Sequence, residues 1–165
     1  MWYMKPVRVT TTVPYPREEV FDFLDVMSNH EPFTNHMLSD WEYSGPDRGI
    51  GSKAKVKANM AGRSESVEIE VIAAERPGMI VEQNVSAGGR RIATGTYTLE
   101  QMPGGETRIA FEYAWKQAPL SDRAAASLVR AILTRGNKRA MARLAEQLAG
   151  TRPDTLPSAT LGERT

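Results

Sequence analysis

Apolar and polar residues alternate with a period of two through most of the chain between residues 53 and 117. This alternation predicts successive β-strands, and a similar segment at 7–13 predicts an earlier one. Residues 16–27 and 121–149 instead repeat apolar side chains every three or four positions, which predicts helices. A run of consecutive strands followed by one long helix is typical of an α+β domain. A curved sheet that grips a helix also tends to leave an apolar cavity between the two.

Two short helices are expected after the first strand. Pro16 fits the first turn of a helix, where the missing N–H has no partner to lose. A second short helix or turn is expected over residues 28–37, begun by Ser28 or Asn29 and interrupted near Pro32. Only then does the series of strands resume.

The first long hairpin carries lysines on one strand and glutamates on the next. A two-residue turn at Gly62-Arg63, with glycine first, is typical of a type II′ hairpin. The pairs that this turn predicts are Lys57 with Glu68 and Lys55 with Glu70. Each pair contributes only about 0.2–1 kcal/mol, so its main effect is to specify the register.

The same alternation assigns an inward face to each later strand. The predicted inward residues are Val67, Ile69, Val71 and Ala73; Met79, Val81, Gln83 and Val85; Ala93, Gly95, Tyr97 and Leu99; and Ile109, Phe111, Tyr113 and Trp115. Trp41 and Tyr43 share one face of a short strand. We expect the last helix to be capped by Ser121 or Asp122 and to end near Gly150.

Three stretches of the chain resemble the START-related superfamily (SRPBCC), which includes polyketide cyclases/dehydratases, aromatase/cyclases, ubiquinone-binding proteins and pollen-allergen-like carriers. Residues 13–25, VPYPREEVFDFLD, resemble its first strand–helix junction, and Gly49-Ile50-Gly51 resembles the glycine pair that opens its third strand. Tyr97-Thr98-Leu99 with Gly105-Glu106-Thr107-Arg108-Ile109 resembles its penultimate hairpin. The likeness extends over residues 7–149. It implies a helix-grip fold: a curved seven-stranded antiparallel sheet wrapped around the C-terminal helix, with a cavity between them.

We therefore expect one ligand-binding domain over residues 1–150. The remaining residues, 151–165, are rich in Pro, Thr and Ser with few large apolar groups, and are expected to be a disordered tail. The superfamily does not imply a single activity, because its members bind, carry or transform different ligands.

Inward residues of such a fold would line the cavity, as walls with a few polar anchors. The expected ligand-binding residues are Trp41, Tyr43, Met60, Met79, Gln83, Tyr97, Phe111, Tyr113, Trp115, Leu133 and Asn137. An inward amide such as that of Gln83 is costly unless it is hydrogen-bonded, by about 1–3 kcal/mol. It would hold a ligand carbonyl or pair with Tyr97. Asn137, after Gly136, is either a polar anchor on the buried side of the helix or an asparagine at its solvent edge, beside a local kink.

Candidates for catalysis are few: His30, His36, Tyr97 and Tyr113. Both histidines fall in the second short helical segment, near the expected mouth of the cavity, and surface or packing roles explain them more simply. A metal site is not expected, because Glu31, Asp40 and Glu42 are near the histidines only in sequence. The chain lacks a nucleophile elbow, a phosphate loop and a dinucleotide motif, so no cofactor is expected.

Composition limits the partners. Lys and Arg (21) nearly balance Asp and Glu (20), which leaves no overall field to attract nucleic acid. The basic residues of the last helix are interpreted as a solvated face. The chain contains no cysteine and no apolar run of membrane-spanning length, so we expect a cytoplasmic protein, monomeric or homodimeric, without stable membrane association.

The sequence thus favours binding of a small, largely hydrophobic ligand, for carriage or sequestration. One alternative is a cyclase- or dehydratase-like enzyme that acts on a polyketide or aromatic substrate. Another is a ligand-free interaction or regulatory module. An empty cavity would favour the first two, and a cavity filled by side chains would exclude them.

Overall fold

The structure, a computed structural model, describes residues 3–151. The expected tail lies, apart from Thr151, outside the described residues. The strands are β1 (Val7–Val13), β2 (Leu38–Ser44), β3 (Lys53–Met60), β4 (Arg63–Glu75), β5 (Met79–Ser86), β6 (Arg91–Gln101) and β7 (Thr107–Gln117). The helices are α1 (Arg17–Leu24), α2 (Glu31–Thr34), α3 (Leu120–Ala124) and α4 (Ala126–Gly150), with short 3₁₀ turns η1 (Met27–His30), η2 (Ala87–Gly89) and η3 (Pro103–Gly105).

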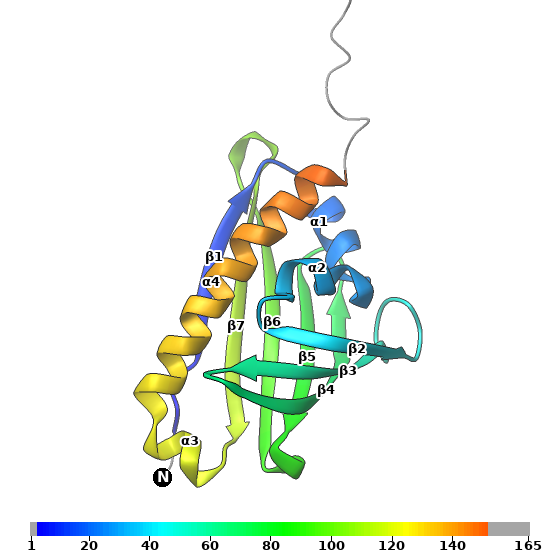
Figure 1. The fold of residues 1–165 in the computed structure, drawn as a ribbon. Coiled ribbons are helices and arrows are strands. Elements are labelled where there is room, and N and C mark those ends of the chain that lie inside the picture. Colours follow the sequence, from blue (N-terminus) through cyan, green and yellow to red (C-terminus); the bar gives the residue numbers. More distant parts are fainter. Residues whose placement is uncertain (1–2, 152–165) are drawn as a thin grey trace, which may run out of the picture.

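All seven strands form one antiparallel sheet in the order β1-β7-β6-β5-β4-β3-β2. The chain crosses from one edge to the other through α1, η1 and α2, because β1 pairs with β7 while β2 pairs with β3. In Figure 1 the sheet is strongly curved, and α4 runs across it with α2 beside its C-terminal half and α3 at its other end. The expected curved seven-stranded sheet with a long C-terminal helix is confirmed.

The main core lies where the C-terminal half of α4 packs on the sheet. Ala140, Met141, Leu144 and Leu148 are its buried residues on the helix. They meet α1 and the inward residues of the strands, among them Ile109 and Val56, which are almost completely buried. The N-terminal half of α4 contributes one buried residue, Leu133, to a second, smaller cluster, with Ala126 and Val129 partly buried against it. The core is therefore concentrated at one end of the helix, which leaves room for a cavity at the other.

The β3–β4 turn differs from the prediction by one residue. The turn residues are Ala61 and Gly62, and Met60 pairs with Arg63 across it. Both turn residues have positive φ, 51° and 77°, as a type I′ turn requires. The observed pairs are Lys55 with Glu68 and Lys53 with Glu70. Because the register moves by two residues, the charges keep to the outer face that the alternation predicted.

The predicted inward face of β5 is wrong. Paired residues of antiparallel strands point to the same side of the sheet. Glu82 pairs with Val71, and Asn84 pairs with Ile69, so Glu82 and Asn84 face inward. Met79 and Gln83 therefore lie on the outer face. The register of β4 shifts between Val71 and Ala73, and this irregularity moves Ala74, instead of Ala73, to the core side.

The last helix also begins differently from the prediction. A short helix, α3, precedes α4, and the two meet at Ala125, whose φ of −107° is not helical. Neither helix has a side-chain cap. Asp122 is buried and bound to Arg91 instead of capping a helix. The break at Ala125 positions α3 over one end of the sheet.

Candidate functional site

A cavity of about 590 Å³ lies between the inner face of the sheet and α4. Its wall is built from η1, α2, the six strands from β2 to β7, α3 and α4. Exposed residues of this wall come from two places only among the described residues, the β3–β4 turn and the start of α3–α4. They are Ala61, Arg63, Ser121 and Leu128. The mouth of the cavity therefore opens between that turn and α3, and the end near α2 is closed.

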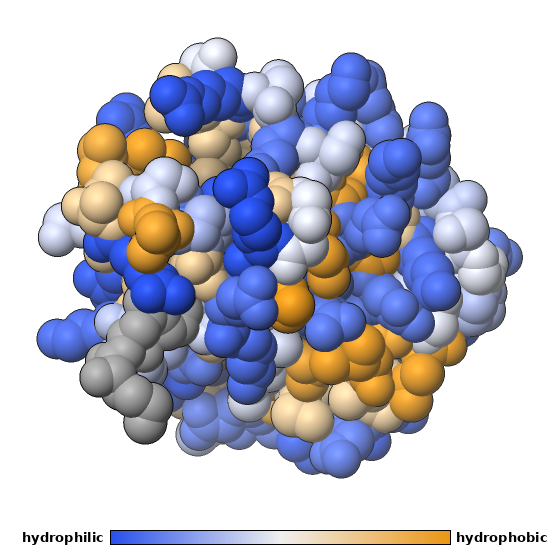
Figure 2. Space-filling model, turned by 90° about the horizontal axis from the view of Figure 1, so that it is seen from below, coloured by the Kyte–Doolittle hydropathy of each residue, from blue (hydrophilic) through white to orange (hydrophobic). Residues whose placement is uncertain are grey.

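Leu128 is the most conspicuous residue at this mouth, because its large apolar side chain is 63% exposed. The predicted apolar side of the last helix thus continues to the rim of the cavity instead of ending in the core. Figure 2 shows the molecule from the side on which α3 lies in Figure 1. Apolar side chains form separate patches there among charged ones.

Aromatic side chains make up much of the cavity wall. Tyr97 and Phe111 are tilted neighbours with ring centroids 4.8 Å apart, and Tyr113 meets Trp115 edge to face at 5.0 Å. Trp41 lines the wall from β2. Burial raises the pKa of Tyr113 to about 12 and that of Tyr97 well above its usual value. Both phenols therefore stay protonated near neutral pH and can donate a hydrogen bond.

Two indole N–H groups in this wall have no partner in the protein. They are Nε1 of Trp41 and Nε1 of Trp115, both of them buried. A buried donor without a hydrogen bond costs about 1–3 kcal/mol, so such groups normally find one. A ligand oxygen in the cavity could accept from either group.

At the closed end, a carboxyl group faces a histidine. Glu82 is 5% exposed and His30 is 4% exposed, and both line the cavity. Nδ1 of His30 lies 3.3 Å from Oε1 of Glu82. That distance suits an ion pair, but Oε1 receives no hydrogen bond. Burial raises the pKa of Glu82, and the nearby His30 partly opposes this shift.

Near the mouth, Arg91 is held by two carboxylates. Its Nε and Nη2 donate to the two carboxylate oxygens of Asp122 at 2.6 and 2.9 Å. Its Nη1 also donates to Glu65 and, at 3.0 Å, to Ser86. This network joins β4, β5 and β6 to α3. Because two negative charges already neutralise Arg91, it is not a free cation for an anionic ligand.

Known proteins share both the sequence pattern and the architecture of this chain. Residues 4–149 match the profile of the family described as polyketide cyclase / dehydrase and lipid transport. The chain belongs to this family. No curated protein sequence matches the chain. The expected START-related, helix-grip assignment is confirmed by the family match and by solved structures that share the fold.

Several solved structures superpose on most of the chain. TTHA0849 from Thermus thermophilus has a TM-score of 0.72 and 17% identity, with 89% of this chain and 99% of that chain covered. The Zhui aromatase/cyclase from Streptomyces sp. R1128 has a TM-score of 0.69 and 12% identity, over 89% and 94%. The di-domain ARO/CYC BexL, from the BE-7585A biosynthetic pathway, has a TM-score of 0.67 and 14% identity, over 88% and 50%. At these identities the likeness shows the fold alone.

Most of the residues predicted for the site of this family member lie in the cavity wall. They are Trp41, Met60, Tyr97, Phe111, Tyr113, Trp115, Leu133, Asn137 and His30. Asn137 is buried, not at the solvent edge, and its Nδ2 donates to the carbonyl oxygen of Leu133 at 2.8 Å. The helix continues unbroken through Gly136. A side chain there would meet Met37, so this glycine makes room for Met37.

Four predicted residues lie outside the cavity wall: Met79, Gln83, Tyr43 and His36. The first three are on strands. Met79 and Gln83 are on the outer face of β5. Tyr43 stacks on Trp41 with ring centroids 5.7 Å apart, but it is 44% exposed, and its hydroxyl donates to Glu31 at 2.8 Å. Its phenol ring is at the sheet edge, outside the cavity.

His36 also lies outside the cavity wall. It links the segment between α2 and β2 to α4 through two hydrogen bonds. Its Nε2 is 2.8 Å from the carbonyl oxygen of Gly136, which can only accept, so Nε2 carries a proton. Nδ1 then accepts from Nη1 of Arg143 at 3.2 Å. Burial is the main cause that lowers the pKa of His36, and Arg139 and Arg143 add to it. A neutral, structural histidine follows.

Sequence reasoning missed the polar residues of the cavity. They are Glu82, Asn84, Ser86, Arg91, Glu65 and Asp122. The first three were assigned to the wrong face of β5. One available signal was the spacing of Glu82, Asn84 and Ser86 at every second position. The alternation of apolar Met79, Val81 and Val85 outweighed it.

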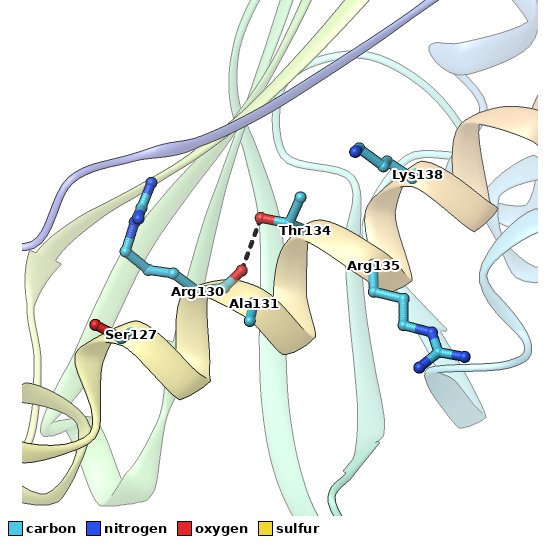
Figure 3. Close-up of a pocket in the computed structure, with 6 residues that line it drawn as sticks. All are labelled: Ser127, Arg130, Ala131, Thr134, Arg135 and Lys138. Carbon is cyan, nitrogen blue, oxygen red and sulfur yellow. Dashed lines mark hydrogen bonds between the residues drawn. The ribbon is translucent and has the colours of Figure 1, made fainter.

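A second, shallow depression of about 470 Å³ follows the outer side of α4. Its residues are Ser127, Arg130, Ala131, Thr134, Arg135 and Lys138 (Figure 3). Arg130 is already engaged, since its guanidinium donates to the carbonyl oxygens of Lys5 and Pro6. Thr134 donates to the Arg130 carbonyl in its own helix. With these groups occupied, the depression offers little to a ligand beyond two surface cations.

Two further features concern the described residues, 3–151. No cluster of three or more His, Cys, Asp or Glu side chains is arranged there to hold a metal ion. None of the helices in this range combines the length and apolar character needed to cross a membrane.

Proposed function

We propose that this protein binds a small, largely apolar molecule in the cavity between its sheet and α4. The observation that carries the proposal is the open cavity of about 590 Å³ with an aromatic wall and a few inward polar atoms. Small-molecule sites typically measure about 300–1,000 Å³ and have this composition. The family description, which includes lipid transport, supports it. The cavity is not filled by side chains, which is the observation that would have excluded a ligand-binding function.

The polar atoms of the wall indicate a ligand that carries oxygen but no net charge. The unpartnered indole N–H groups of Trp41 and Trp115 can donate to carbonyl or hydroxyl oxygens. A carboxylate inside the cavity would find Arg91 already neutralised and Glu82 in the wall, since the other arginine of the lining, Arg63, is exposed at the mouth. A neutral, hydrophobic ligand with one or more oxygen atoms fits these features best.

Binding of a neutral fluorescent probe, N-phenyl-1-naphthylamine, tests the proposal. We expect saturable binding of one probe per chain by the wild-type protein. Ala58 lines the cavity from β3, and Ala58→Phe should weaken binding by about tenfold or more because the ring occupies the cavity. Lys57→Phe places the same ring on the outer face of the same strand and should leave the affinity unchanged.

Native mass spectrometry of the protein as expressed complements the probe. An added mass that disappears on denaturation would identify the occupant of the cavity. The proposal fails if the probe does not saturate, or if the two phenylalanine variants bind it equally well.

A cyclase- or dehydratase-like activity is a second candidate, and one specific observation favours it. Such chemistry requires a group that moves protons next to the bound substrate. Glu82, buried in the wall with His30 beside it, is a group of that kind. The Zhui protein, which shares this fold, is described as an aromatase/cyclase.

A further inference from the structure

Glu82 is an unusual residue for the inner face of a strand. It pairs with Val71 on one side and Gly95 on the other, so its side chain projects into the apolar interior. An ionised carboxylate is expensive to bury unless it is paired and hydrogen-bonded. Here the only ion-pair partner within 4 Å among the described residues is His30, and Oε1 receives no hydrogen bond. The carboxyl group thus retains an unused hydrogen-bonding position in the cavity.

The contacts of His30 decide which of its two ring nitrogens carries the N–H proton. Its Nε2 is 2.7 Å from the carbonyl oxygen of Leu24. A carbonyl oxygen only accepts hydrogen bonds, so Nε2 must carry the proton and donate. Nδ1 is left facing Glu82 at 3.3 Å. The nitrogen without this proton is therefore the one that faces the carboxyl group, at the wall of the cavity.

Tyr97 completes the arrangement from the neighbouring strand. It lies two residues beyond Gly95, the partner of Glu82, on the same face of the sheet. The backbones of such diagonal neighbours are about 7–8 Å apart, within reach of long and aromatic side chains. The Tyr97 ring packs against His30 with centroids 5.5 Å apart. A hydrogen-bond donor and a proton acceptor thus face the same part of the cavity.

We propose that Glu82 is a general base that enolises a neutral carbonyl compound bound in the cavity, with His30 as its positioning residue and Tyr97 as the hydrogen-bond donor to the carbonyl oxygen. This inference rests on the proposed ligand-binding function. The substrate class is a ketone with a C–H group next to its carbonyl.

The step balances without a cofactor. The Glu82 carboxylate takes the proton from the carbon next to the carbonyl, and the C–H electron pair forms the C=C bond of the enolate. The carbonyl π electrons move to oxygen, where the Tyr97 hydroxyl donates a hydrogen bond. The protonated Glu82 either exchanges its proton with solvent and delivers a solvent proton (a deuteron in D₂O) to the same carbon, or it delivers the proton to a conjugated carbon. The first result is exchange, the second is isomerisation, and the carboxylate is restored in both.

The surroundings of Glu82 are suited to such a base. Burial raises its pKa, which makes the carboxylate a stronger base than a solvated one, and the nearby His30 partly opposes this shift. Tyr97 on β6 is a second titratable group that faces it. Of the two arginines that line the cavity, Arg91 is paired with Asp122 and Glu65, and Arg63 is exposed at the mouth.

The experiment uses 2-tetralone, a neutral aromatic ketone with activated C–H groups. Its affinity is measured by calorimetry, and the loss of its C1 proton signals in D₂O is followed by NMR. We expect the wild-type protein to accelerate exchange by about 100-fold over buffer. Glu82→Gln should bring the rate back to that of buffer while the affinity changes by less than about threefold. Glu68→Gln makes the same chemical change on the outer face of β4 and should exchange at the wild-type rate.

The pH dependence of the exchange rate in His30→Gln tests whether His30 acts on Glu82. A purely structural role of His30 would leave this pH dependence unchanged. Removal of the imidazole takes away the group that lowers the pKa of Glu82. The rate rises with pH as the base ionises, so this rise should occur at higher pH in His30→Gln than in the wild-type protein.

The outcomes separate the two proposals. If 2-tetralone binds but wild-type exchange equals that of buffer, or Glu82→Gln exchanges as fast as wild type, the enolisation proposal is overturned while ligand binding stands. If Glu82→Gln does not fold, an unchanged pH profile in His30→Gln overturns it equally. If neither 2-tetralone nor the naphthylamine binds, the proposed function itself fails.

Discussion

Gly136→Ala should destabilise the protein, although glycine is normally the poorer residue inside a helix. A Cβ atom at this position would overlap Sδ of Met37 and lie 3.3 Å from its Cγ. The backbone of Met37 cannot easily retreat. Its N–H donates to the carbonyl oxygen of Thr34 at 2.8 Å, and its own carbonyl accepts from the N–H of Asn59 at 2.7 Å. The new methyl group must therefore displace the Met37 side chain.

Two opposing effects set the magnitude. Replacing glycine by alanine inside a helix gains about 1 kcal/mol in helix propensity. Forcing a methyl group into a filled space costs about 1–3 kcal/mol. Because the clash involves the middle of the Met37 side chain as well as its sulfur, we expect the cost to exceed the gain. The net loss in the free energy of unfolding should be about 1 kcal/mol.

Urea denaturation followed by far-UV circular dichroism measures this change. Gly150→Ala is the matched control, because a Cβ there would meet nothing within 4 Å. The sign should reverse when Met37 is first shortened to alanine, since the space is then free and only the helix-propensity gain remains. If Gly136→Ala raises the free energy of unfolding equally in the wild-type and the Met37→Ala backgrounds, the steric argument is refuted.

Two further predictions concern stability. Burial raises the pKa of Glu82 in the folded protein above its ordinary value of 4.5, so folding takes up protons and the wild-type protein loses stability as pH rises above that value. Urea titrations should show that the stability of Glu82→Gln relative to wild type increases from about pH 4 to about pH 7, and a constant difference would contradict the shift. Ala61 occupies the first position of the β3–β4 turn at φ 51°, where asparagine is favoured. Ala61→Asn should raise the unfolding free energy by about 0.5–1 kcal/mol, whereas a loss of stability would show that the left-handed conformation is not strained.

The sequence alone determined the order of elements and the faces of the regular strands. Tyr97, Phe111 and Tyr113 point inward as the alternation predicted, because an uninterrupted strand has a side-chain period of two. The helical spacing of Leu133 and Asn137 likewise indicated the inner side of α4. Such local periodicities are properties of the backbone geometry, so they can be read without knowledge of the neighbouring elements.

The polar part of the site depended on the tertiary structure. An irregularity between Val71 and Ala73 changes which residues of β4 face inward, and a period of two cannot register it. The apolar residues of β5 gave the wrong face because the inward face there borders a cavity, where a polar side chain is tolerated if it is partnered. Periodicity assumes that every inward face is a packed core.

The pairing of distant residues was the second feature that only the fold decided. His30 follows α1, whereas Glu82 lies in the middle of the sheet, and the two meet because the crossing from β1 to β2 carries η1 over β5. Arg91 and Asp122 meet because the helix breaks at Ala125 and sets α3 over the end of β6. Electrostatic pairs act over a few ångströms in space, and separation along the chain carries no information about them. The sequence therefore determined the frame and the apolar wall of the cavity, and the tertiary structure determined its chemistry.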